Sequence, residues 1–218
     1  MNLLNALRNT TTTFEEPYRH WLVEKPITPD MVAEVAATPI PDGRRVYDGT
    51  RAADNGGGGV DGKLRCYVTT ENCDEFPEMH RLVNELLDPE TVTHFEHILG
   101  RDLSDAYLRL EVIADRVGFW LKPHKDIKEK LMSMLVYVNV CGEPENLGTD
   151  IYDGDLNVAK TIPYRNNIGY LFGPSDDTWH GMEKGKEIQQ ERRSILINYV
   201  TFETCWKVPD VHAQRKAA

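Results

Sequence analysis

The sequence lacks a long hydrophobic run and a secretory leader. No apolar stretch approaches the roughly 18 residues that a membrane-spanning helix requires. The chain begins MNLLNALRNTTTTFEE, without the basic start and the long apolar core of a secretory signal. We therefore expect a protein that does not associate with a membrane.

Cysteine is scarce, and no two cysteines have the spacing of a C-x-x-C pair. A chain of this length can bury enough apolar surface to fold without disulfide bonds. We therefore expect reduced thiols and a cytoplasmic location. The four cysteines are Cys66, Cys73, Cys141 and Cys205.

Basic residues are in the minority. The chain has 25 Lys and Arg against 35 Asp and Glu, and a formal net charge of -10. Nucleic-acid binding needs clustered basic side chains, so the composition argues against a nucleic-acid partner. Hydrophobic residues make up 40% of the 218-residue chain, which is ordinary for a globular protein and fits a single domain over residues 1–218.

The first half of the chain favours helices and loops. Thr28 is a good N-cap residue and is followed by proline, which suits a first helical turn. Residues 75–87 and 89–99 carry apolar side chains at helical spacing, and Gly100 is expected to end the second helix.

Residues 48–63 contain four consecutive glycines, which cannot hold regular structure, and we expect a loop that could serve as a lid. Within it, residues 57–63 are similar to a phosphate-binding P-loop. Leu64, however, stands where that motif needs a Ser or Thr for magnesium, and no apolar strand precedes the glycines. A nucleotide site is therefore the weaker interpretation.

The second half favours short strands separated by turn residues. Many short strands without helical patterns between them predict an antiparallel sandwich or jelly roll. We expect this mainly β core over residues 105–206, buttressed on one sheet by helices from residues 1–104, with 207–218 as a tail. The strand-like runs are residues 107–114, 117–122, 131–139, 149–152, 168–172 and 193–202.

The segment His124-Lys125-Asp126 offers two metal ligands. Residues two apart in an extended segment point to the same side, so the imidazole and the carboxylate converge. With His180 from a distant strand, they would form the two-histidine, one-carboxylate triad that holds iron(II) with open coordination positions. A lone H-x-D occurs often by chance, a lone His usually makes one hydrogen bond, and zinc accepts the same ligands.

Arg192 and Ser194 open a strand and should share one face of it. A buried guanidinium needs an anion, and its planar shape suits a carboxylate that binds through both oxygens. The alternative is that Arg192 and Arg193 lie outside and pair with Glu187 or Glu191.

Six short motifs follow one another in a fixed order: PHKD, YVN, GTDIYD, NIGYLF, TWHG and RRS. Their order and spacing resemble those of the 2-oxoglutarate and iron(II)-dependent oxygenases of the prolyl-hydroxylase-like superfamily. The resemblance covers roughly residues 107–202. It implies a double-stranded β-helix, which is a cupin-like jelly roll, and iron(II), 2-oxoglutarate and O2 as cofactor and co-substrates.

The resemblance also implies roles for single residues. His124, Asp126 and His180 match the iron ligands. The reaction would be hydroxylation of an unactivated C–H bond, with release of succinate and CO2. Asp126 fits hydroxylation, because relatives that halogenate carry a small residue at the position of this carboxylate.

Arg192, with Ser194, matches the residues that bind the distal carboxylate of 2-oxoglutarate. Tyr137 stands where relatives place a tyrosine whose hydroxyl reaches the same carboxylate. The distance in sequence from His180 to Arg192 is longer than usual because of the insert EKGKEIQQE. This leaves the choice between Arg192 and Arg193 open, and strand parity with Ser194 favours Arg192.

Residues that contact the prime substrate are the weakest prediction. Arg109 and Glu111 share one face of a strand and could recognise a polar substrate, or they could form a solvent-facing pair. Trp120 and Trp179 flank the proposed ligands and could contact substrate or pack in the core. The substrate, a small molecule or a side chain, is not specified.

Two other interpretations stay open. His94 and His97 could form a metal pair, but on a helix they fall on the polar face, where a solvated stripe is the commoner outcome. The jelly roll could instead be a non-catalytic, cupin-like metal or sensor domain. Such a domain has no use for a co-substrate anchor at Arg192, so binding of 2-oxoglutarate would separate the two.

Overall fold

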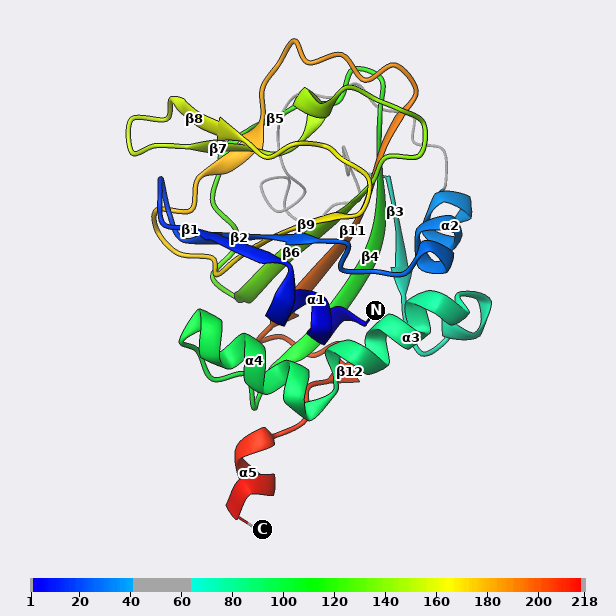
Figure 1. The fold of residues 1–218 in the computed structure, drawn as a ribbon, viewed down its shortest axis with the longest axis vertical. Helices are drawn as coiled ribbons and strands as arrows, with labels where there is room; N and C mark the ends of the chain where they lie inside the picture. The colour runs from blue at the N-terminus through cyan, green and yellow to red at the C-terminus, as the bar shows by residue number, and fades with distance from the viewer. Residues whose placement is uncertain (1, 41–63, 217–218) are drawn as a thin grey trace.

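The computed structural model describes residues 2–40 and 64–216, and Figure 1 shows its two facing sheets and the helices packed against the larger one. The predicted loop at residues 48–63 and its P-loop-like stretch lie outside the described residues, so both interpretations stay predictions.

The larger sheet has the strand order β1-β2-β9-β6-β11-β4-β12, with β3 also paired to β4. Its strands are β1 Thr11–Phe14, β2 His20–Glu24, β3 Leu64–Val68, β4 Tyr107–Arg116, β6 Lys130–Val138, β9 Ile168–Phe172, β11 Glu191–Val200 and β12 Trp206–Lys207.

The smaller sheet has the order β5-β10-β7-β8, and every described pairing in both sheets is antiparallel. Between β4 and β11 the chain crosses repeatedly from one sheet to the other, which is a double-stranded β-helix, so the predicted fold class is confirmed. The strands of the smaller sheet are β5 Leu121–His124, β7 Asp150–Tyr152, β8 Val158–Thr161 and β10 His180–Met182.

Local signals position the helices. The Thr28 side chain accepts the Met31 N–H and proline follows the cap, as the sequence predicts. The helix before Gly100 ends there because this glycine adopts a left-handed φ of 63°. The helices are α1 Leu3–Asn9, α2 Pro29–Ala37, α3 Pro77–Leu86, α4 Pro89–Leu99 and α5 Val211–Lys216.

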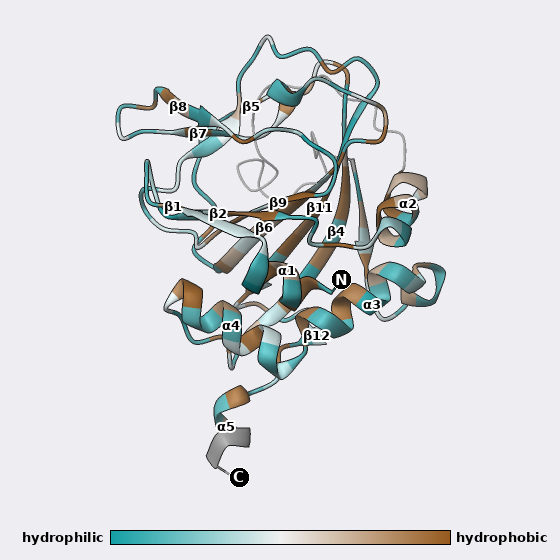
Figure 2. Ribbon diagram, viewed as in Figure 1, coloured by the Kyte–Doolittle hydropathy of each residue, from teal (hydrophilic) through white to brown (hydrophobic). Residues whose placement is uncertain are grey.

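Helices α1 to α4 cover the outer face of the larger sheet, as predicted. Figure 2 shows brown, apolar residues along strands of the larger sheet, directly above the helical layer in this view. Alternate residues of β4 and β11 point to this side, and they form one hydrophobic cluster with the buried faces of α1 to α4. Strand members of this cluster are Leu108, Leu110, Val112, Ile195 and Ile197.

The prediction of helices and loops alone in the first half is wrong for three segments. β1 and β2 form a hairpin whose second strand pairs with β9, and β3 pairs with β4. These strands have four or five residues each, too few for a clear alternation in sequence. They form because the eight core strands leave sheet edges to which they can pair.

Two short strands of the smaller sheet, β8 and β10, were also not predicted. β10 has three residues, and its strand conformation depends on its neighbours β5 and β7. Each helix within residues 2–40 and 64–216 is too short or too polar to span a bilayer.

Candidate active site

Strand pairing brings two predicted metal ligands together. His124 ends β5, His180 begins β10, and the two residues are register partners across the antiparallel pair. Their ring centroids lie 4.3 Å apart. Gly181 permits this approach, because a Cβ there would lie 2.6 Å from the carbonyl oxygen of Leu121.

Asp126 completes the cluster from the turn between β5 and β6. One ligand atom each from His124, Asp126 and His180 lies within 4.8 Å of the other two. Within the described ranges, neither His94 nor His97 belongs to a group of three such side chains.

Both imidazoles are oriented by backbone carbonyls. Nδ1 of His124 lies 3.0 Å from the carbonyl oxygen of Lys122, and Nδ1 of His180 lies 3.0 Å from that of Thr178. A carbonyl can only accept, so each Nδ1 carries the proton and Nε2 keeps the lone pair that a metal needs. This donor set, two imidazoles and one carboxylate, fits iron(II).

The Asp126 carboxylate is held on both oxygens. Ser133 donates to Oδ2 at 2.6 Å, and the Lys130 ammonium lies 2.7 Å from Oδ1. Burial alone would raise the pKa of Asp126, but the charge of Lys130 and the hydrogen bonds from Lys130 and Ser133 lower that pKa well below its usual range. The Asp126 carboxylate is therefore ionised, as binding of a metal would require.

Arg192 lies on the face of β11 that points between the two sheets, and it is 3% exposed. Its guanidinium carbon stands 5.3 Å from the ring centre of Tyr137 and 5.6 Å from that of Tyr164. Nε donates to the carbonyl oxygen of Leu147, and Nη1 pairs with the buried Asp115. The anion that Arg192 requires is thus supplied, at least in part, by the protein itself.

Arg193 points to the opposite face. Its Nη1 donates to three carbonyl oxygens at the end of α2, those of Val35, Ala36 and Thr38. Arg193 therefore connects the sheet to the helical layer, and only Arg192 of the two faces the interior. A role for Arg192 in binding co-substrate stays a prediction.

A buried carboxylate anchors the insert between His180 and Arg192. Glu143 is 5% exposed and accepts the backbone N–H groups of Gln189, Gln190 and Glu191. Since β11 begins at Glu191, these hydrogen bonds hold the strand where Arg192 faces inward.

Ser194 and Tyr137 are register partners on β11 and β6. The Ser194 hydroxyl is buried and has no hydrogen-bond partner among the described residues. The Tyr137 hydroxyl is already engaged, since it donates to Thr149 Oγ1 at 2.7 Å and accepts the Thr149 N–H at 3.0 Å. Burial raises the pKa of Tyr137, and the nearby Arg192 opposes that rise.

On the inner faces of β6 and β11, Leu135 and Leu196 lie between the triad of candidate ligands and the pair of Arg192 and Ser194. They are register partners, and each keeps a small exposed fraction, 7% and 8%. From the candidate metal ligands inward, the surface is therefore charged, then apolar, then polar again at Ser194 and Arg192.

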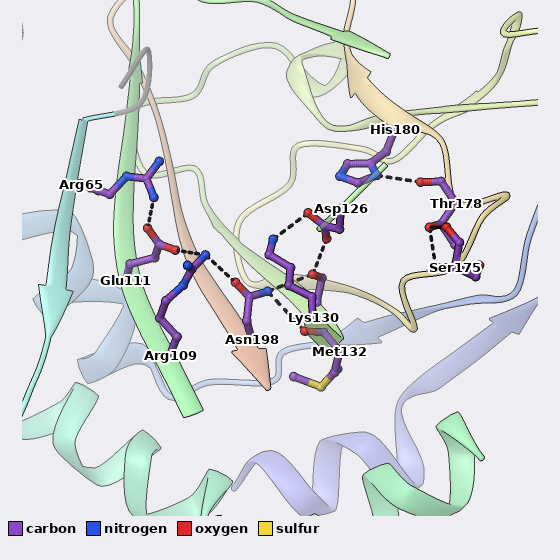
Figure 3. A network of polar contacts seen from close by, with 11 residues as sticks. Arg65, Arg109, Glu111, Asp126, Lys130, Met132, Ser175, Thr178, His180 and Asn198 are labelled. Carbon is purple, nitrogen blue, oxygen red and sulfur yellow. Dashed lines mark hydrogen bonds and ion pairs between the residues drawn. The ribbon is translucent and has the colours of Figure 1, made fainter. Parts of the chain in front are cut away.

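Arg109 and Glu111 point into the interior, where Glu111 is fully buried and Arg109 is partly exposed, so they are not a solvent-facing pair. Glu111 is fully buried between Arg65, at 2.7 Å, and Arg109, at 3.1 Å. Arg109 also donates to Asn198. Figure 3 shows this polar network running from Arg65 to Asp126, with His180 lying beside Asp126. We define it as Arg65, Glu111, Arg109, Asn198, Ser133, Lys130 and Asp126.

The two tryptophans do not belong to this polar network. Lys184 stands 5.3 Å over the ring of Trp120, and Lys125 stands 5.0 Å over the ring of Trp179.

Sequence reasoning missed several members of the interior. Asn198 has the parity of Arg192 and Ser194 on β11, and Ser133 has the parity of Tyr137 on β6, so the signal for these two was present. Asp115 likewise shares its parity with Arg109. The pairing of Arg65 had no such signal, because β3 was not predicted.

Comparison with known proteins adds a fold. No protein-family model matches the chain, and no curated protein sequence matches it. Among solved structures, a prolyl-4-hydroxylase from Pseudomonas putida is 14% identical, with a TM-score of 0.53, over 92% of this chain and 98% of that one.

A prolyl hydroxylase from Trichoplax adhaerens, solved with a peptide of hypoxia inducible factor, is 12% identical, with a TM-score of 0.55 and coverage of 91% and 87%. A 2OG-Fe(II) oxygenase family member from Burkholderia pseudomallei is 11% identical, with a TM-score of 0.52 and coverage of 84% and 79%. The chain thus has the jelly-roll fold of the prolyl-hydroxylase-like 2-oxoglutarate and iron(II)-dependent oxygenases.

Proposed function

We propose that the protein is a 2-oxoglutarate and iron(II)-dependent dioxygenase that hydroxylates an unactivated C–H bond of a small molecule or a side chain. One oxygen atom of O2 would enter the C–H bond and the other would enter succinate, with release of CO2. The observation that carries the proposal is the cluster of His124, Asp126 and His180, whose ligand atoms lie within 4.8 Å of one another, inside this fold.

The interior beyond the triad supports 2-oxoglutarate as co-substrate. That molecule has a 2-oxo acid at one end, two methylene groups and a carboxylate at the other end. The inner face offers the same order: metal ligands, then Leu135 and Leu196, then Arg192 and Ser194. A buried hydroxyl without a partner costs about 1–3 kcal/mol, so a carboxylate that accepts from Ser194 would relieve that cost.

The protein's own residues position and shield the reactants. Nε2 of His124 and of His180, with a carboxylate oxygen of Asp126, would hold the iron, and the bound iron would supply the dioxygen chemistry. Ser133 and Lys130 keep Asp126 ionised and oriented. Leu135 and Leu196 would exclude water from the middle of the co-substrate.

An anaerobic calorimetric titration tests the proposal. The wild-type chain should bind 2-oxoglutarate only after Fe(II) is added, and air should then produce succinate. The variant His124→Ala should lose Fe(II) binding. Metal binding without 2-oxoglutarate binding would contradict the proposal and favour the non-catalytic, cupin-like metal or sensor domain.

A further inference from the structure

The charged side chain of Arg109, on β4, lies beside the triad. Arg109 and Asn198 are register partners, as are Asn198 and Ser133, so the three form one row across β4, β11 and β6. Arg109 donates to Asn198 Oδ1 at 3.2 Å, and Asn198 donates to Ser133 Oγ at 2.9 Å. Ser133 in turn donates to Asp126, so three hydrogen bonds connect Arg109 to a metal ligand.

Arg109 keeps donors that the protein does not use. A guanidinium has five N–H groups, and Arg109 Nε is buried without a hydrogen-bond partner in the described part of the chain. Its Nη2 lies 3.1 Å from Glu111 Oε1, yet that oxygen also accepts no hydrogen bond from the residues described. The ion pair with Glu111 therefore neutralises the charge of Arg109 and leaves N–H groups of its guanidinium without a hydrogen-bond acceptor.

Glu111 orients this arginine and does not itself serve a ligand. It is fully buried, and Arg65 holds its other oxygen at 2.7 Å. A buried carboxylate is stable only when it is paired, so Glu111 keeps the Arg109 guanidinium near the triad. The Arg109 side chain is 22% exposed, whereas that of Glu111 is 0% exposed. Of the two, Arg109 is the group that a ligand can reach.

We propose that Arg109 binds a carboxylate of the prime substrate and so directs the substrate's C–H bond to the triad. This inference rests on the proposed function and adds the substrate class. A guanidinium presents parallel N–H groups that match the two oxygens of a carboxylate. The carboxylate can belong to a small free acid or to an acidic side chain of a peptide, since both present the same group.

The test uses the protein loaded with Fe(II) and 2-oxoglutarate and a panel of matched ligands. Each small carboxylic acid is paired with its carboxamide, and each Asp- or Glu-containing peptide with its Asn or Gln counterpart. The readout is succinate release above the rate without substrate. Acids should stimulate release and their amides should not, and the two arms of the panel distinguish a free acid from a peptide.

Two variants connect the effect to the residue. Arg109→Gln should raise the Kd of the stimulating acid about tenfold to a hundredfold, because a charge-assisted pair is lost. Arg109→Lys should restore part of the affinity. Arg8→Gln is the matched control, since Arg8 is half exposed and pairs with Glu90 at 3.5 Å on the helical layer.

Three results would overturn the inference. The first is that amides stimulate succinate release as strongly as acids do. The second is that no acid of the panel stimulates it. Arg109→Gln could also raise the Kd of 2-oxoglutarate more than that of the acid, which would make Arg109 the co-substrate anchor. Failure of the proposed function is separate, because the wild-type protein would then not bind 2-oxoglutarate in the presence of Fe(II).

Discussion

At the scale of single residues, two neighbouring arginines on one strand perform opposite tasks. Arg192 faces the interior and pairs with Asp115, whereas Arg193 faces outward and holds the end of α2. Each arrangement gives a guanidinium partners that it would otherwise lack when buried. The alternation of side chains along β11 decides which arginine can meet a ligand between the sheets.

The pair Arg192→Gln and Arg193→Gln tests this division. Arg192→Gln should raise the Kd of 2-oxoglutarate at least tenfold, since a carboxylate loses its cation. Arg193→Gln should lower the free energy of unfolding by about 1–3 kcal/mol, because carbonyls of α2 lose their donor, without that rise in Kd. Calorimetry and urea denaturation measure the two effects.

Arg192→Gln also leaves the buried Asp115 without its cation, which lowers the free energy of unfolding by about 3–5 kcal/mol and could unfold the chain. The double variant Asp115→Asn with Arg192→Gln removes both charges and keeps the test valid. A weakened 2-oxoglutarate affinity in Arg193→Gln instead would show that the wrong arginine was assigned.

At the scale of elements, the short pair β5–β10 builds the candidate metal site. Its four- and three-residue strands place His124 opposite His180, and the turn after β5 adds Asp126. Neither strand would be stable alone, so the site depends on their pairing. Because Gly181 has no side chain, the backbones of β5 and β10 can approach each other closely there.

Gly181→Ala should therefore damage the site without touching a ligand. Its Cβ would lie 2.6 Å from the Leu121 carbonyl oxygen, which forces β5 and β10 apart. We expect a loss of about 1–3 kcal/mol in the free energy of unfolding and weaker Fe(II) binding. Gly154→Ala is the control, since nothing lies within 4 Å of a Cβ there. Equal Fe(II) affinity in the two variants would contradict the prediction.

At the scale of the whole molecule, edge strands and helices enclose a core that carries buried histidines. His20 on β2 is fully buried; burial lowers its pKa, and nearby Lys160 adds to that lowering. Burial likewise lowers the pKa of His94 on α4. Both groups are therefore neutral in the folded chain at a pH where the unfolded chain begins to bind protons.

Stability should consequently fall in mild acid. Below the ordinary histidine pKa of 6.5, the unfolded chain takes up protons that folded His20 and His94 refuse. The stabilising difference is complete above that value and is lost as the pH falls toward the lowered pKa values. The urea midpoint should decrease from about pH 7.5 to about pH 5.5, and His20→Gln should reduce the decrease. An unchanged midpoint would contradict this.

Much of the fold followed from local rules in the sequence. The Thr28 cap, the stop at Gly100 and the period-2 alternation of β4 and β11 are short-range effects that neighbouring residues determine. Strand parity alone placed Arg192 and Ser194 on one face. The triad residues could be named because H-x-D, a distant histidine and the ordered motifs occur together.

Only the tertiary structure decided which partners these residues meet. The pairing of Asp115 with Arg192, of Tyr137 with Thr149 and of Arg109 with Asn198 joins side chains that no sequence spacing relates. Register between strands is set by packing of the whole core and not by the strands themselves. For that reason the sequence determined the candidate metal ligands and the faces of the strands, while the folded chain determined that Arg109, paired with Glu111 and Asn198, lies beside them.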